Sequence, residues 1–324
     1  MLMLILDTKT ALQGGLSGVH ACMMAVIPSL LPFFVVSIML TNSLSGLRLG
    51  FLAPLGRLCR MPAGSEQLLI LGLLGGYPTG AQAVGQSYRN GDISRQDANR
   101  LLGFCSNAGP SFLFGIAAAA FARPWMPWAL WLIHILSAVL TGMLLPGKAV
   151  RCARTHSTTA VSLPDAIEQA AKIMAKVCAW IILFRVILAF CDRWFLWLFN
   201  TEAQTLFVGL LELANGCLQL HRISNTGLRF VVCSCILSLG GLSVAMQTLS
   251  VTGSLGFGMY LHGKFIQTLI SFLLAYPVQF LLCGEEQCLI PPVILIVTVA
   301  ILGVFLLFLH KNKNYSRNPE KVIV

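Results

Sequence analysis

Long apolar runs alternate with short polar or basic stretches along this chain. A helix of roughly 20 apolar residues crosses the hydrocarbon core of a bilayer, so each uninterrupted run predicts a spanning helix. The predicted ordinary spans are Leu16–Leu40, Met126–Leu145, Ala171–Phe190, Gly256–Leu282 and Leu289–Leu309. The mixed stretch Asn42–Ser65, with arginines among leucines, predicts a helix at the membrane interface.

One apolar segment, Glu66–Tyr88, contains helix breakers in its middle. Gly75, Gly76, Pro78 and Gly80 stand there, although Gly costs about 1 kcal/mol and Pro about 3 kcal/mol in a helix interior. In lipid, the freed backbone groups need partners inside the protein or in a wet cavity. A break at this depth predicts a hairpin tip or a binding site, as in transporters with interrupted helices.

A second broken segment, Thr205–Leu220, resembles the first. The residues Gly72-Leu-Leu74 and Gln82 recur 137 residues later as Gly209-Leu-Leu211 and Gln219. Each copy precedes an arginine and a further broken apolar run, namely Arg100 with Asn107–Pro110 and Arg229 with Gly240–Gly241. Two similar halves are the pattern of a repeat-built transporter. The alternative is chance similarity between two stretches rich in Gly and Leu.

The predicted fold is therefore an all-α polytopic membrane protein with two inverted-topology halves, each with a re-entrant hairpin and a broken transmembrane helix. The predicted units are a first membrane half (1–146), a cytoplasmic linker (147–170), a second, inverted half (171–283), a C-terminal transmembrane helix (289–310) and a basic cytoplasmic tail (311–324).

Composition supports the membrane assignment. The 324 residues are 56% hydrophobic and 10% charged, with a mean hydropathy of +0.80, whereas soluble domains carry about 25% charged residues. The net charge of +10 does not argue for nucleic acid, because basic loops are typical of membrane topology. The eleven cysteines are scattered, mostly in apolar runs, and are expected to be small apolar core residues.

Charge also predicts the orientation. If both broken segments enter and leave the membrane on one side, thirteen Lys and Arg residues fall in cytoplasmic loops and five in external loops. This agrees with the positive-inside rule, and in this arrangement the first hairpin enters the membrane from inside and the second from outside. A rival arrangement makes Thr205–Leu220 a full span and Leu228–Leu249 the hairpin, and it fits the charges slightly better. We prefer the inverted arrangement because only it makes the halves equivalent.

Glu212 is the sharpest functional candidate, because it lies inside an apolar broken segment rather than at its edge. A carboxylate at membrane depth is costly unless it is paired or wet. We expect it to couple transport to a proton or a sodium ion, or to bind a donor on the substrate. The alternative is a structural carboxylate that caps the neighbouring half-helix.

Polar residues beside the breaks are the other candidates for substrate contact. Half-helices that begin near Pro110 and Thr79 would aim backbone N–H groups into a cavity, which suits a carboxylate. The alternative is a kink whose polar groups satisfy each other. With Glu212, the predicted substrate-binding residues are Tyr77, Thr79, Gly80, Ser106, Asn107, Ser111, Asn215, Ser243 and Gln247.

Other charged residues inside the apolar runs are more ambiguous. Arg185 would neutralise an anionic substrate, pair with Glu212 or snorkel to an interface. Lys264 and His262 are expected at an interface, near the start of a span. The sequence contains no nucleotide-binding loop, catalytic triad or metal signature, so we expect neither an enzyme nor a bound cofactor or metal.

Four motifs carry a family resemblance: Pro28-Ser-Leu-Leu-Pro-Phe33, Gly75-Gly-Tyr-Pro-Thr-Gly-Ala81, Phe104-Cys-Ser-Asn-Ala-Gly-Pro110 and Glu212-Leu-Ala-Asn-Gly216. Together they resemble the YlbJ/SpoVV sporulation integral membrane proteins, of a wider group with a nucleoside-recognition Gate domain related to concentrative nucleoside transporters. The resemblance runs from about Pro28 to Tyr276. Thr79 stands where the family pattern has serine, and Ser106 where it has a second asparagine.

The resemblance implies a role in endospore formation, with dipicolinic acid carried from mother cell toward forespore across the outer forespore membrane. We therefore expect a multi-pass transporter of a small anionic metabolite. The expected partners are that substrate, a coupling ion (H⁺ or Na⁺), the lipid bilayer and, as a further candidate, a second copy of the chain. The rivals are a carrier of nucleosides or related metabolites and a non-transporting membrane scaffold in sporulation.

Overall fold

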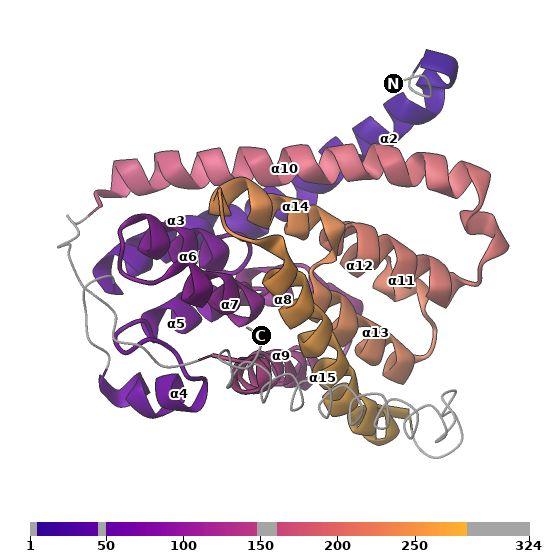
Figure 1. Ribbon diagram of the computed structural model, residues 1–324. Helices are drawn as coiled ribbons and strands as arrows, with labels where there is room; N and C mark the ends of the chain where they lie inside the picture. The colour runs from indigo at the N-terminus through magenta and orange to yellow at the C-terminus, as the bar shows by residue number, and fades with distance from the viewer. Residues whose placement is uncertain (1–4, 45–49, 148–160, 284–324) are drawn as a thin grey trace, which may run out of the picture.

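The computed structural model describes residues 5–44, 50–147 and 161–283, and these residues form helices and no strand (Figure 1). The predicted C-terminal helix 289–310, the tail 311–324 and most of the linker 147–170 lie outside the described residues. The first half contains α2 (Thr8–Ala21), α3 (Ile27–Leu44), α4 (Ala53–Leu58), α5 (Gln67–Gly75), α6 (Thr79–Arg89), α7 (Arg95–Cys105), α8 (Pro110–Gly115) and α9 (Trp125–Leu144). The second half contains α10 (Leu163–Trp194), α11 (Thr201–Leu211), α12 (Leu213–Gln219), α13 (Thr226–Leu239), α14 (Gly241–Thr252) and α15 (Phe257–Cys283).

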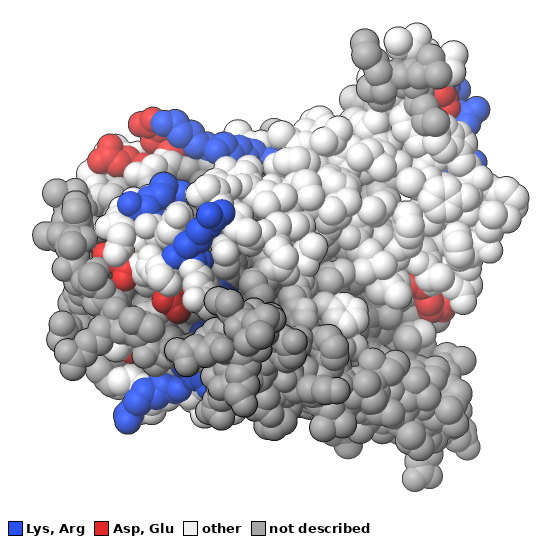
Figure 2. Space-filling model, in the orientation of Figure 1, with Lys and Arg blue, Asp and Glu red and all other residues white. Residues whose placement is uncertain are grey.

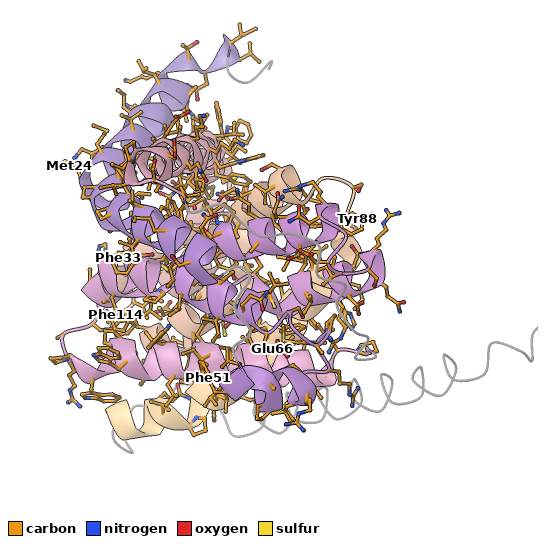
Figure 3. The ribbon with its side chains drawn as sticks, turned by 90° about the vertical axis from the view of Figure 1, so that its left-hand side faces the viewer. Met24, Phe33, Phe51, Glu66, Tyr88 and Phe114 are labelled. Carbon is orange, nitrogen blue, oxygen red and sulfur yellow. The ribbon has the colours of Figure 1, made fainter. Side chains whose placement is uncertain are left out.

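Four helical segments of the described chain are long and apolar enough to cross a membrane: Thr8–Leu40, Trp125–Leu144, Leu163–Trp194 and Thr226–Thr252. The first three contain or closely match a span predicted from the sequence, and the fourth coincides with the apolar run broken at Gly240–Gly241. A multi-pass membrane protein is thereby supported. Apolar side chains face outward as they do against lipid: Met24 is 70% exposed and Phe33 46% exposed, both at the outer edge of the bundle (Figure 3).

The first span packs along the long helix α10 through small residues. A Cβ atom on Gly14 or Gly18 would lie 2.9 Å from the backbone of α10, so only glycine permits this approach. At one end of the pair, Arg193 forms a salt bridge of 3.0 Å with Asp7. A hydrogen bond with Thr10 and the charge of Arg193 hold the pKa of Asp7 below its usual value.

Both broken segments fold back on themselves at glycine crossings. A Cβ atom on Gly80 would lie 2.6 Å from the Cα atom of Gly72, and one on Gly216 would lie 2.3 Å from the Cα atom of Gly209. Residues seven or eight apart in one straight helix are more than about 10 Å apart. Thr205–Leu220 is therefore not one straight helix. Its bend is at Glu212, between α11 and α12.

The helices that follow the two hairpins are also interrupted, but in different ways. Four residues without helical geometry, Ser106 to Gly109, separate α7 from α8. Two consecutive glycines with positive φ, Gly240 at 78° and Gly241 at 76°, mark the boundary between α13 and α14. The arginines that precede the two breaks have similar structural roles. The side chain of each donates hydrogen bonds to carbonyl groups of neighbouring segments. Arg100 reaches the ends of α4 and α9, and Arg229 reaches Ala120 and Ile223.

Two buried clusters hold the helices together. One joins α3, α8, α9, α10, α12 and α13 around the breaks, and the other joins α5, α6, α7, α9 and α15. The two hairpins lie toward opposite ends of α10 (Figure 1). The inverted, re-entrant topology of the two halves and the boundaries of the predicted units stay predictions.

On the face drawn in Figure 2, most charged side chains lie toward one end of the molecule, a few lie at the other end, and the described surface between them carries none. The exposed residues Arg89, Lys172 and Lys176 lie at the more charged end. At 32 residues, α10 is about 48 Å long, which exceeds a hydrocarbon core of about 30 Å. We therefore expect its charged N-terminal part to extend beyond the core, and the cytoplasmic location that the positive-inside rule predicts for this end stays a prediction.

The inverted arrangement gives a labelling prediction. A cysteine at Asn90, after α6, should react with an impermeant thiol reagent from the cytoplasmic side, and one at Ser224, before α13, from the opposite side. Ser224 is chosen because it is exposed, whereas the side chain of Asn225 caps α13. The measurement compares intact cells with inside-out vesicles in a background without native cysteines. Labelling of both positions from one side would contradict the inverted arrangement.

Candidate functional site

The breaks of the two halves meet at a small cavity of about 30 Å³. A water molecule needs roughly 10–15 Å³ by this measure, so the cavity has room for about two waters and no metabolite. Apolar residues of α3 and α10 form one wall. The predicted site residues that line the cavity are Tyr77, Ser111, Glu212 and Gln247.

Tyr77 connects the break of the first hairpin to the second half. Its hydroxyl donates a hydrogen bond of 3.4 Å to the carbonyl of Leu237 in the last turn of α13. Its ring lies against Gly240, where an added Cβ atom would come within 3.1 Å of the ring. Gly240 therefore serves two needs, since it accepts a left-handed conformation and leaves room for the ring.

Glu212 lies at the N-terminus of α12 and is 2% exposed. Its carboxylate accepts hydrogen bonds from the backbone N–H groups of Ala214 (3.0 Å) and Asn215 (2.6 Å) and from the Asn215 side chain (2.8 Å). The structural cap foreseen as an alternative is thus present. Glu212 also lines the cavity, so the cap does not exclude a functional role.

The interfacial position expected for Lys264 is wrong, because its side chain is 1% exposed in the interior. Its ammonium donates hydrogen bonds to the Tyr77 hydroxyl (3.2 Å), to Gln267 Oε1 (2.7 Å) and to the carbonyl of Ser106. The break after α7 leaves that carbonyl without a helical partner, and Lys264 supplies one. No carboxylate pairs with Lys264 among the described residues.

Further polar contacts brace the first break from α9 and α15. The Asn107 side chain donates to the carbonyl of Phe104 (2.7 Å) and accepts from Gln267 Nε2 (2.9 Å). His134 Nε2 lies 3.1 Å from the backbone nitrogen of Ala108, as an acceptor for that N–H group. Sequence reasoning missed Lys264, Gln267 and His134. A lysine and a glutamine three residues apart in an apolar run was the available signal.

Six predicted site residues support the cavity from behind instead of lining it: Thr79, Gly80, Ser106, Asn107, Asn215 and Ser243. Gly80 provides the hairpin crossing, and Ser243 Oγ is an acceptor for Gln247 Nε2 at 3.2 Å. The side-chain hydroxyls of Thr79 and Ser106 are buried without a hydrogen-bond partner. Substrate contact by any of the ten predicted residues stays a prediction.

Arg185 does not pair with Glu212. Its Nε atom donates to Ser17 Oγ at 3.0 Å and so joins α10 to α2. Among the described residues, no group of three His, Cys, Asp or Glu side chains is placed to hold a metal ion. Tyr77 and the capping carboxylate of Glu212 thus line a narrow cavity, and the buried side chain of Lys264 contacts the Tyr77 hydroxyl.

Comparison with known proteins gives one partial similarity. The sporulation integral membrane protein YlbJ of Bacillus subtilis is 30% identical over 118 residues, which are 35% of this chain and 28% of that protein. The matched part is thus less than a third of the relative's length. No protein-family model matches the chain, and no solved structure matches it. The apolar helices and this match together indicate a multi-pass membrane protein similar in part to a sporulation protein.

Proposed function

We propose that the chain is a membrane transporter of a small anionic metabolite during sporulation, and that dipicolinic acid is its substrate. The outer forespore membrane is the proposed location. The observation that carries the proposal is the cavity at the meeting point of the broken segments, inside a bundle of apolar helices. Interrupted helices at membrane depth are used by transporters to form central binding sites.

The buried ammonium of Lys264 favours an anionic substrate. It contacts Tyr77, which lines the cavity, and its other contacts are neutral oxygen atoms. An uncompensated positive charge in a low-dielectric interior attracts an anion more strongly than it would in water. The two re-entrant hairpins, in inverted halves, would open and close the path to this site.

The cavity in the present conformation is small. With about 30 Å³ it cannot hold a planar dicarboxylate, because pockets for small molecules have volumes of roughly 300–1,000 Å³. Transport therefore requires the walls to separate. Tyr77 of the first half contacts Gly240 and Leu237 of the second half. This contact would break when the walls separate.

The test is uptake of radiolabelled dipicolinate into proteoliposomes, with nucleosides as competitors. Saturable uptake that unlabelled dipicolinate reduces and nucleosides do not is the expected result. Uptake reduced only by nucleosides would favour the nucleoside carrier. Absence of uptake of either substrate by folded protein would favour the scaffold.

Glu212 is proposed to couple uptake to an ion, because a proton or a sodium ion beside its carboxylate would reduce repulsion of the incoming anion. In Glu212→Gln we expect substrate binding to persist and pH-driven accumulation to fall at least tenfold, as for loss of about 1.4 kcal/mol of coupling. The measurement is accumulation against an imposed pH gradient. Loss of sodium dependence instead would indicate that sodium is the coupling ion.

The matched control is Glu202→Gln, in the first turn of α11 and outside the cavity. It should retain wild-type accumulation. Unchanged uptake and unchanged ion dependence in Glu212→Gln would show that Glu212 acts as the cap of α12 alone.

A further inference from the structure

A second, larger cavity lies at the charged end of the molecule. It is beside the cavity lined by Tyr77 and Glu212, which we call the inner cavity. Its volume is about 300 Å³, which reaches the size of ordinary small-molecule pockets, roughly 300–1,000 Å³. Helices α6, α10 and α14 form its walls. We call it the vestibule, and its lining residues are Pro78, Gln82, Arg89, Gln169, Lys172, Ile173, Lys176, Val177, Gln247, Ser250 and Val251.

The vestibule carries a surplus of positive charge. Of its three cations, Lys172 is paired with Glu168 at the rim. Arg89 is held by neutral acceptors, the carbonyl of Val251 (3.3 Å) and Gln86 Oε1 (2.9 Å), so its charge is not compensated. Lys176 forms no salt bridge within the described residues. A concave site lined by one sign of charge concentrates ligands of the opposite sign.

The vestibule adjoins the inner cavity. Val177 and Gln247 line both, and Pro78 in the vestibule follows Tyr77 in the inner cavity. These residues therefore lie between a wide cationic space and a narrow one. A ligand that passed from the charged end to the inner cavity would pass these residues.

We propose that the vestibule is an outer binding site for a small organic dianion, which it collects before the inner cavity admits it. The proposal rests on the transport function proposed above. Anionic lipid headgroups share the chemistry of such a ligand. A soluble dianion is favoured because Gln82, Gln169 and Gln247 add amide donors inside the vestibule, and because the space leads to the inner cavity.

The charge of the vestibule can be tested without any substrate. In a background without native cysteines, Ile173→Cys in the vestibule is compared with Gln96→Cys, which is exposed on α7 between a basic and an acidic residue. The protein is held in phosphatidylcholine nanodiscs. At each position we measure the ratio of two labelling rates, that of an anionic methanethiosulfonate reagent divided by that of a cationic one. We expect this ratio to be about tenfold higher at residue 173 than at residue 96.

Adding Arg89→Gln and Lys176→Gln should remove most of this preference, and adding Arg57→Gln, an exposed cation outside the vestibule, should not. Equal preference at residues 173 and 96, or no effect of the double substitution, would overturn the proposal.

The ligand is tested in the same system. Dipicolinate should slow labelling at residue 173. For equal protection, the double variant should need a dipicolinate concentration that is higher by about threefold for each cation removed. Protection by phosphatidylglycerol in the nanodisc, without protection by dipicolinate, would assign the site to lipid and overturn the proposal.

If wild-type protein takes up dipicolinate but the double variant has an unchanged KM, the vestibule proposal fails and the transport proposal stands. If uptake is absent while the charge preference and the dipicolinate protection remain, the transport proposal fails instead.

Discussion

Lys264→Met is expected to reduce anion uptake about 30-fold while the protein still inserts and folds. At a separation of about 7 Å and an effective dielectric constant of about 20, one charge stabilises a bound monoanion by about 2 kcal/mol. A dianion would lose more. Methionine removes that attraction and retains the length and apolar stem of lysine, so the helix α15 can pack as before.

Stability should change much less than uptake in this variant. Removing Lys264 leaves three oxygen atoms without its hydrogen bonds, at a cost of about 1–3 kcal/mol for each buried group. Against this, the protein no longer has to desolvate a charge, which costs several kcal/mol. The two effects offset each other to a large extent.

The measurements are initial uptake rate in proteoliposomes and thermal stability in detergent. Lys9→Met, an exposed lysine at the start of α2, is the control and should match wild type in both. Uptake within about twofold of wild type in a folded Lys264→Met variant would remove the ammonium from substrate binding.

Alanine at the two glycine crossings is expected to destabilise the protein strongly and to a similar extent. In Gly80→Ala the new Cβ atom would lie 2.2 Å from the carbonyl oxygen of Cys105, and in Gly216→Ala 2.3 Å from the Cα atom of Gly209. Both contacts are with backbone atoms, which cannot rotate away. Overpacking of this kind costs about 1–3 kcal/mol and occasionally more.

Thermal unfolding in detergent measures the effect, and Gly258→Ala is the matched control. No atom lies within 4 Å of a Cβ atom at Gly258, and in helix α15 alanine is favoured over glycine by about 1 kcal/mol. This control should be at least as stable as wild type. A large loss in one crossing variant and none in the other would contradict the equivalence of the two hairpins.

The sequence was sufficient for the features that depend on local chemistry. Three of the four long apolar helices, Thr8–Leu40, Trp125–Leu144 and Leu163–Trp194, follow from hydropathy alone. The hairpin bend at Gly76 to Pro78 follows from residues that no helix interior favours. Gly72 and Gly209 occupy matching positions in the sequence, and each lies at a close backbone crossing in the structure.

Tertiary structure decided which side chains meet. The sequence placed Lys264 at an interface because a lysine near the start of an apolar run has a short path to water, but α15 packs against α7, α9 and α13 and buries it. Asn107 does not line the cavity, and its amide is hydrogen-bonded to Phe104 of α7 and Gln267 of α15. The vestibule joins α6 to α10 and α14, far apart along the chain. Local pattern determines where a helix starts, bends and enters lipid, whereas burial and cavities arise only from the packing of distant segments.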